Sequence, residues 1–280
     1  MAEPFGIVSG VVGIAAAFSA CVDCFEYVKL GRRLGRDFQT SQLALNCARL
    51  RLSRWGEAVH VFDDPHLGNP NATPDELQNA KNTLFHILCL FEDTAAISHK
   101  YRLRAKSSDD LSEFMTGDLD ATSTVLNNKM RELAILRQKQ SSILRTAKWA
   151  LYEGSEFKRL MENITLLIGD LETLFPARPQ QASLIGHELK ELHDQQHLKL
   201  LAATAQGVDE ALRRGADEAL SAHQYRNIQV KGKAHNGDVF GDHWQRGAVG
   251  KAHTYDGVVV DPGGKVVNGN QYGGKSFWDD

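Results

Sequence analysis

The spacing of apolar residues divides the chain into a long helical part and a shorter C-terminal part made of strand-forming residues. Between residues 40 and 201 apolar side chains recur every three or four positions, which places them on one face of a helix. Several such segments with short connections predict an all-α helical bundle with an ample core. We expect helices over about residues 40–62, 73–91, 124–152, 155–175 and 184–222, the last of them weakening around Gly207.

Two of these helices have recognisable ends. Thr73, Pro74 and Glu76 form the pattern of an N-cap, a proline at the first helical position and a capping glutamate. Pro176 and Pro179 are expected to stop the helix over residues 155–175.

The first stretch differs from the later helices because residues 5–22 include no charged side chain. This length is at the lower limit for a helix that spans a bilayer, and Gly6 and Gly10 have the spacing that lets membrane helices approach closely. Glu3 stands where a signal peptide would be positive. Three interpretations stay open: a buried first helix, a membrane helix, or a segment buried at rest and inserted after release. The candidate membrane-inserting residues are Phe5, Gly6, Ile7, Val8, Gly10, Val11, Val12, Ile14 and Phe18.

The composition changes after residue 225. Residues 226–280 contain no Leu, Met, Cys or Glu, and they hold eleven of the chain's 24 glycines. Their apolar residues are mainly valines and aromatic residues in short bursts between turn formers, which is typical of strands.

The C-terminal segment also repeats itself. GKAH occurs at residues 232–235 and again at 250–253, whereas VFGD at 239–242 resembles VNGN at 267–270 with a different offset. Two stacked β units are therefore predicted, with their register open. Their open edges would recruit further copies into a cross-β stack, and the alternative is a disordered glycine-rich tail. The candidate amyloid-core residues are Asn227, Ile228, Val230, Ala234, Val239, Phe240, Gly241, Val258, Val260, Val266, Val267, Gly269, Asn270, Tyr272, Phe277 and Trp278.

Three motifs imitate chemical sites. Residues 269–276 match the phosphate-loop pattern, but only four residues follow Ser276, so we expect no helix to receive a phosphate. Cys21 and Cys24 have no second C-x-x-C pair to complete a zinc site, so we expect them to be structural. His193 and His197 enclose Asp194 rather than the glutamate of a zinc protease, and a solvated helix face is expected. The sequence therefore predicts no enzyme activity, metal or cofactor.

Four stretches of the chain resemble one known family, the fungal HET-s/HET-S heterokaryon-incompatibility proteins. They are EPFGIV at residues 3–8, CVDCFEYV at 21–28, RLSRWGEAV at 51–59 and YGGKSFWDD at 272–280, supported by QKQ at 138–140 and WALY at 149–152. The resemblance implies an α-helical HeLo domain over residues 1–222. It also implies a prion-forming domain over residues 223–280, disordered when soluble and a two-rung β-solenoid amyloid when assembled, with two pseudo-repeats.

The same resemblance implies a mechanism and partners. Amyloid formation by the tail would refold the helical domain and expel its apolar N-terminal segment into a membrane, which kills the cell. Expected partners are other copies of the chain in amyloid and helical-domain oligomers, an allelic partner, a NOD-like receptor with a matching amyloid motif, and a membrane on activation. The charge of −3 gives no reason to expect nucleic acid. The expected location is the cytoplasm before activation and the membrane after it.

Two residues are implied to determine activity within this family. Asp23 matches a residue needed for prion-only behaviour, and Arg33 stands where the toxic and prion-only forms differ. Arg33 has the residue of neither form, so both a pore former and a prion module that only sequesters a partner stay open.

Overall fold

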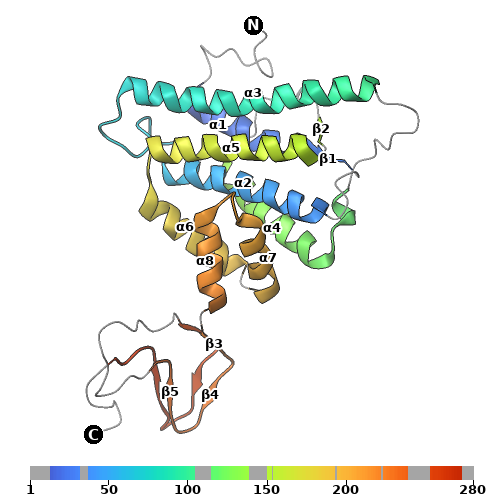
Figure 1. The fold of residues 1–280 in the computed structure, drawn as a ribbon. Helices are drawn as coiled ribbons and strands as arrows, with labels where there is room; N and C mark the ends of the chain where they lie inside the picture. The colour runs from blue at the N-terminus through green and yellow to red at the C-terminus, as the bar shows by residue number, and fades with distance from the viewer. Residues whose placement is uncertain are drawn as a thin grey trace. The chain divides into compact units, whose positions relative to one another are not determined.

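A computed structural model describes residues 13–31, 37–104, 115–138, 150–152, 154–192, 194–221, 223–238 and 253–272. The chain divides into two compact units, Met1–Gly215 and Ala216–Asp280. The first unit is helical and the second carries short strands (Figure 1).

The predicted all-α class of the first unit is confirmed. Its elements follow one another as α1 (Ile14–Cys24), η2 (Phe25–Tyr27), β1 (Val28–Leu30), α2 (Phe38–Ala58), α3 (Pro74–Arg104), η4 (Thr116–Asp118), α4 (Ala121–Gln138), β2 (Ala150–Tyr152), α5 (Gly154–Leu174), α6 (Arg178–Glu191) and α7 (Gln195–Ala205). The last helix, α8 (Glu210–Ser221), begins in the first unit and ends in the second.

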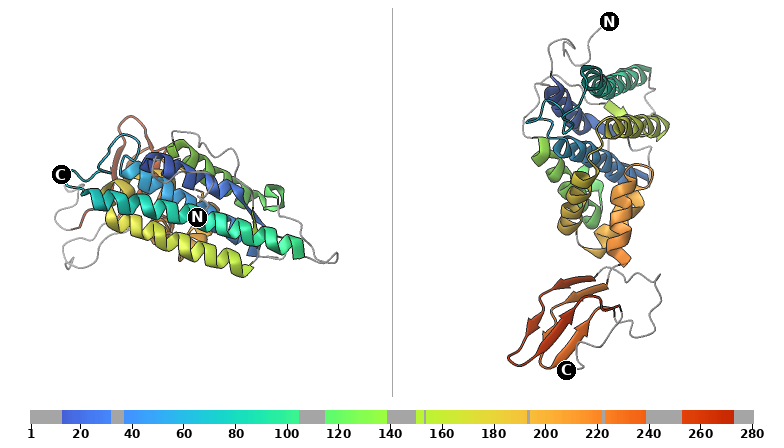
Figure 2. Two further views of the ribbon diagram at one scale, coloured as in Figure 1. Left: turned by 90° about the horizontal axis from the view of Figure 1, so that it is seen from above. Right: turned by 90° about the vertical axis from the view of Figure 1, so that its left-hand side faces the viewer.

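The α2 helix lies at the centre of this unit. It packs against α4, α5, α6 and α7, while α3 lies beside both α1 and α5 (Figures 1 and 2). Trp55 of α2 is fully buried, as are Leu84 of α3 and Ile164 of α5. The core therefore forms around a helix that is covered on several sides.

The predicted start of α3 is confirmed in detail. The backbone N–H of Thr73 donates to the Glu76 carboxylate at 2.7 Å, and the backbone N–H of Glu76 donates to the Thr73 hydroxyl at 3.2 Å. Pro74 occupies the first helical position, where its missing N–H costs no hydrogen bond.

The prediction of one helix over residues 124–152 was wrong. The α4 helix ends at Gln138, and Ala150–Tyr152 forms β2, which pairs in parallel with β1. The helical propensity of residues 150–152 is overridden because β1, far away in the sequence, offers a partner for their backbone.

The prediction of one helix over residues 184–222 was also wrong, because this region contains most of α6 and all of α7 and α8. Asp194 caps α7 by accepting from the backbone N–H of Gln196 at 2.8 Å. Gly207 has a φ of 74°, which ends the helical course before α8. Pro179 lies in the first turn of α6, where proline is tolerated, so it begins the next helix as well as excluding continuation of α5.

The described part of the second unit contains two sets of three strands. The first set is β3 (His223–Arg226), β4 (Gln229–Val230) and β5 (Lys233–Asn236), and the second is β6 (His253–Asp256), β7 (Val259–Val260) and β8 (Lys265–Asn268). Strands β3, β4 and β5 pair in parallel with β6, β7 and β8 respectively. The two sequence units therefore stack as two layers in one chain.

The pairing register of the two layers differs from the alignments that the repeated sequence motifs suggest. Paired residues differ by 30 in number in the first two strand pairs and by 32 in the third, where Lys233 lies opposite Lys265. A turn at Pro262 and Gly263 takes up the two extra residues. GKAH does not lie opposite its sequence match, since His235 pairs with Val267 and His253 pairs with His223, while residues 239–242 lie outside the described residues. Register follows the lengths of strands and turns rather than shared letters.

The corners of the two layers coincide. Asn227 has a φ of 51° and Gly257, thirty residues later, has a φ of 65°. Directly after β5 and β8, Gly237 has a φ of 139° and Gly269 a φ of 123°. Left-handed backbone favours glycine and asparagine, so the glycines of the tail serve repeated corners.

Candidate functional site

The described part of the predicted membrane segment is α1, and it is buried in the bundle. Ala17, Phe18, Cys21 and Val22 have no exposed surface, and Ile14 is partly buried. Among the described residues no helix is both long and apolar enough to cross a membrane. The remaining predicted inserting residues, Phe5, Gly6, Ile7, Val8, Gly10, Val11 and Val12, lie outside the described residues.

Phe18 fixes α1 against α2. Its ring lies on Gly56, where an added Cβ would be 2.3 Å from two ring atoms. The ring centroid is 6.3 Å from that of Trp55 and 5.7 Å from that of Phe62. A glycine inside a helix costs roughly 0.5–1 kcal/mol relative to alanine. This cost is offset by the close packing of Phe18.

Polar contacts hold the other side of α1. The Cys21 thiol donates to the Leu84 carbonyl of α3 at 3.2 Å. The Gln138 amide, at the end of α4, donates to the Ser19 carbonyl at 3.0 Å and to the Asp23 carboxylate at 2.5 Å. Asp23, predicted as an activity determinant, therefore joins α1 to α4. Arg33, the other predicted determinant, lies outside the described residues.

The two cysteines of the C-x-x-C motif are buried free thiols. Burial raises the pKa of Cys21, helped by the neighbouring Cys24, and burial together with Asp23 raises the pKa of Cys24. Such thiols resist ionisation and are poor nucleophiles. The part of the chain that the structure describes contains no group of three metal-ligating side chains, and His193 lies outside it.

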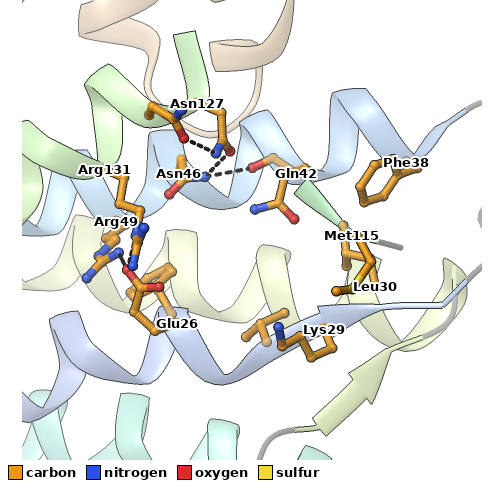
Figure 3. Close-up of a pocket in the computed structure, with 13 residues that line it drawn as sticks. Glu26, Lys29, Leu30, Phe38, Gln42, Asn46, Arg49, Met115, Asn127 and Arg131 are labelled. Atoms are coloured by element: carbon orange, nitrogen blue, oxygen red, sulfur yellow. Dashed lines mark hydrogen bonds and ion pairs between the residues drawn. The ribbon is translucent and has the colours of Figure 1, made fainter. Parts of the chain in front are cut away.

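Glu26, just after α1, forms a second polar anchor (Figure 3). Its carboxylate binds Arg49 of α2, and Arg131 Nε of α4 lies 2.5 Å from the same oxygen. Burial alone would raise the pKa of Glu26, but the two guanidinium groups outweigh it and hold this pKa below its usual value. The exit of α1 is thus tied electrostatically to α2 and α4.

A buried ionic network connects α2 with the start of α8. Arg54 Nη2 is 2.7 Å from Glu188 Oε2, and its Nη1 is 2.9 Å from Asp209 Oδ2. Arg137 of α4 also binds Glu188, at 2.5 Å. Arg54, Glu188 and Asp209 are each at most 1% exposed. Burial would lower the pKa of Arg54, but its two carboxylate partners raise it further above its ordinary value.

The same region anchors the first turn of α8. Asp209 accepts from the backbone N–H of Leu212 at 3.1 Å, and Arg51 donates to the Val208 carbonyl at 2.7 Å. Neither spacing nor motif in the sequence marks Arg54, Glu188 or Asp209 as functional. Charged residues inside apolar helix faces are the only sequence feature that could have indicated them.

The predicted amyloid-core residues lie in both layers of the tail. Val230 is buried, Ile228, Ala234, Val258, Val266, Val267, Gly269 and Tyr272 are half-buried, and Asn227, Val260 and Asn270 are exposed. Val239, Phe240, Gly241, Phe277 and Trp278 lie outside the described residues.

Polar side chains and backbone groups join the two layers. The Asn236 amide donates to Asn268 at 3.0 Å, and the rings of Tyr225 and Tyr255 stack with centroids 5.1 Å apart. Backbone N–H groups of the second layer donate to carbonyls of the first, as from Val259 to Ile228 at 2.8 Å and from Lys265 to Gly232 at 2.9 Å.

The outer edges of the strand pairs can accept another layer. Within the described tail each strand pairs with one other strand only. The opposite edge of such a strand presents a row of backbone donors and acceptors that a further strand can use. An identical chain could add its second layer to this first layer in the same register.

Comparisons with known proteins cover the whole chain by sequence and the helical part by structure. Residues 6–201 match the HeLo family, described as "Prion-inhibition and propagation". The chain is 35% identical over 289 residues to the heterokaryon incompatibility proteins s and S of Podospora anserina, with both proteins covered in full. Among solved structures, the HET-S N-terminal domain matches 78% of this chain and 98% of its own, with 37% identity and a TM-score of 0.72. A doubly substituted HET-s N-terminal domain matches 74% of this chain and 98% of its own, with 36% identity and a TM-score of 0.69.

The fold defines a class of protein in which a helical bundle buries an apolar N-terminal helix and precedes a unit of parallel stacked strands. The chain belongs to the HeLo prion-inhibition and propagation family.

Proposed function

We propose that this chain is a prion-controlled heterokaryon-incompatibility protein. Stacking of the tail onto other copies would refold the helical unit and release the N-terminal apolar segment to a membrane, with death of the cell. The observation that carries this proposal is the continuity of the chain: α8, whose first turn joins the buried ionic network, ends at Ser221, and β3 begins at His223.

This continuity makes tail assembly costly for the helical unit. A tail that draws residues of α8 into the growing stack would pull Asp209 away from Arg54, which is 1% exposed and would keep only Glu188 as its carboxylate partner. Leaving a buried ion with no partner costs about 3–5 kcal/mol, and the loss of one of two partners costs a part of this. Domains are stable by only about 5–15 kcal/mol, so this part lowers the stability of the helical unit noticeably.

The neighbours of Arg54 in α2 would pass the disturbance to α1. Trp55 and Gly56 follow Arg54 directly, and both contact Phe18. A shift of α2 that follows the loss of Asp209 would therefore open the site that holds Phe18. Growth of the stack supplies the free energy, because each added copy gains backbone hydrogen bonds along both layers.

The proposed partners follow from the two surfaces. Other copies, an allelic form, or a NOD-like receptor with a matching motif would add strands to the open edge, while the released N-terminal segment would enter a membrane. The protein would act from the cytoplasm and move to the membrane when activated, and neither a cofactor nor nucleic acid takes part.

A second candidate is a prion-type module that sequesters partners and never forms a pore. The burial of α1 favours it, because Ala17, Phe18, Cys21 and Val22 all serve the core. Expelling them would leave a large void in the bundle.

Seeding separates the two functions. Fibrils grown from residues 218–280 would be added to the full-length protein beside dye-loaded liposomes. The pore former is supported if the intact chain causes leakage and a chain lacking residues 1–12 still forms fibrils but causes none. Deleting residues 1–22 is unsuitable because it removes buried core residues. Fibril growth without leakage in either chain would support the sequestering module.

A further inference from the structure

A polar pocket of about 270 Å³ lies between the exit of α1, the α2 helix and the α4 helix (Figure 3). Its wall includes Glu26, Lys29, Asn46, Arg49, Asn127 and Arg131. Glu26 and Arg49 help to anchor the exit of α1, but the proposed function gives the pocket no role.

Positive charge predominates in this pocket. The lining residues include three cationic side chains, those of Lys29, Arg49 and Arg131, and one carboxylate, that of Glu26. Glu26 binds both arginines through one oxygen, so their remaining N–H groups need other acceptors. A site of this composition favours a small anion over a neutral or cationic ligand.

One N–H group of the Arg49 guanidinium has no hydrogen-bond acceptor. Its side chain is 2% exposed, and its Nε has no hydrogen-bond partner. A buried guanidinium N–H without an acceptor is rare and unfavourable, and a bound ion is one of the explanations for such a group. Arg131 is 49% exposed, so it stands at the mouth of the pocket where an anion can enter.

The remaining lining residues indicate which chemical group is attached to the anion. Asn46 donates to Asn127 at 2.6 Å and so holds these amides at the polar end. Leu30, Phe38 and Met115 form an apolar end (Figure 3). The volume accommodates a phosphate group and a few further heavy atoms, since binding pockets for larger ligands start at about 300 Å³.

We infer that this pocket binds a phosphomonoester whose phosphate lies at Arg49 and Arg131 and whose short apolar portion lies against Leu30 and Phe38. Arginine forks match phosphate oxygens with two parallel hydrogen bonds. The same chemistry is offered by a soluble alkyl phosphate and by the headgroup of an anionic phospholipid. The site does not depend on the proposed function. A bound ligand would join η2, α2 and α4, and so stabilise the folded helical unit.

The test uses the full-length soluble protein and isothermal titration at fixed ionic strength with inorganic phosphate and with propyl phosphate. We expect propyl phosphate to bind about three- to tenfold more tightly, because its carbons reach the apolar end. Glu26→Gln should tighten binding about five- to tenfold by removing the competing carboxylate, and Arg131→Gln should weaken it by a similar factor. These two variants change the charge in opposite directions and shift the affinity in opposite directions.

The exposed pair Lys158 and Glu162 on α5 provides matched controls. Lys158→Gln and Glu162→Gln make the same changes in total charge as Arg131→Gln and Glu26→Gln, and they should leave the affinity unchanged. Lys29→Gln supplies a second weakening variant if Arg131→Gln disturbs the fold. Equal shifts in the control and pocket variants, or no heat of binding with either phosphate, would overturn the inference.

Vesicles distinguish the two sources of phosphate. Flotation with phosphatidylcholine vesicles that contain phosphatidic acid, competed by propyl phosphate and weakened by Arg131→Gln, would assign the site to a lipid headgroup. If propyl phosphate binds in the titration but does not compete with vesicle binding, the site would be assigned to a soluble phosphomonoester. Both results support a phosphate site.

Discussion

At the scale of single residues, the position of α1 depends on a few close contacts rather than on general apolar burial. Phe18 occupies the space that a side chain on Gly56 would need, and Trp55 and Phe62 prevent the ring from moving aside. Glu26 and Gln138 then fix the polar side of the same segment. Individual substitutions should therefore reveal how α1 is held.

Gly56→Ala should lower the free energy of unfolding by about 1–2 kcal/mol. Overpacking a core costs about 1–3 kcal/mol, and alanine returns up to about 1 kcal/mol through helix propensity. Phe18→Leu in the same chain should recover part of the loss, because leucine leaves space for the added methyl group. Urea denaturation of the two single variants and the double variant measures the coupling. Strictly additive effects would contradict the proposed contact.

Glu26 should make the helical unit more sensitive to acid. Its pKa in the folded protein lies below that of the unfolded chain, so its stabilising effect is complete above the unfolded pKa of about 4.3 and is lost as the pH falls through the folded pKa. Hydrogen bonds to charged groups contribute about 1.5–3 kcal/mol when buried, and a side chain that is 33% exposed should contribute less.

Urea denaturation between pH 3 and pH 7 of the wild type and Glu26→Gln measures this effect. The wild type should be more stable by roughly 1–2 kcal/mol near neutral pH, and the difference should shrink below about pH 4. Glu162→Gln on α5 should change stability by less than about 0.5 kcal/mol at every pH. A difference that grows as the pH falls would show that Glu26 has no stabilising ion pair.

At the scale of elements, the three parallel strand pairs of the tail place two lysines against each other. Lys233 of β5 lies opposite Lys265 of β8, and both side chains are exposed. Like charges directly opposite in neighbouring strands are destabilising by roughly 0.2–1 kcal/mol. In a stack of many chains this arrangement would recur at every layer.

Lys265→Asp should therefore stabilise fibrils of residues 218–280. The concentration of soluble peptide left at equilibrium should fall about two- to fivefold, since 1.4 kcal/mol corresponds to a factor of ten. Lys233→Asp should have the same effect. The double variant restores a pair of like charges and should return to nearly the wild-type value. A double variant less soluble than either single variant would show that net charge, and not register, controls assembly.

At the scale of the whole chain, the proposed function requires mechanical continuity between α8 and β3. Only residue 222 separates Ser221 from His223, so assembly of β3 into a long stack acts directly on the end of α8. A long flexible connection at this point would remove the tension but keep both units intact.

An insertion of about 20 Gly/Ser residues after residue 222 should leave fibril growth unchanged and abolish seeded leakage. The flexible segment spans tens of ångströms, so the tail can stack without withdrawing Asp209 from Arg54. Thioflavin fluorescence and dye release from liposomes report the two events in one sample. An insertion of Glu-Ala-Ala-Ala-Lys repeats of equal length serves as a stiffer control. Full leakage with the flexible insertion would show that local concentration, and not tension, activates the helical unit.

The sequence by itself determined the features that depend on neighbouring residues. Thr73 and Glu76 predict the start of α3 because a capping box forms within one turn. The glycines of the tail predict corners because left-handed backbone is a property of the residue itself. Apolar spacing and composition likewise separate a helical bundle from a strand-forming tail.

The tertiary structure alone decided the features that depend on distant partners. Residues 150–152 form a strand because Val28–Leu30 lies beside them, and the sequence around them predicts a helix. Arg54, Glu188 and Asp209 come from three separate helical regions, so their ionic network exists only when the bundle is packed. The register of the tail follows the Pro262 turn rather than the repeated letters. Local free energies can be judged residue by residue along the chain, whereas burial and pairing are set by which segments meet in space.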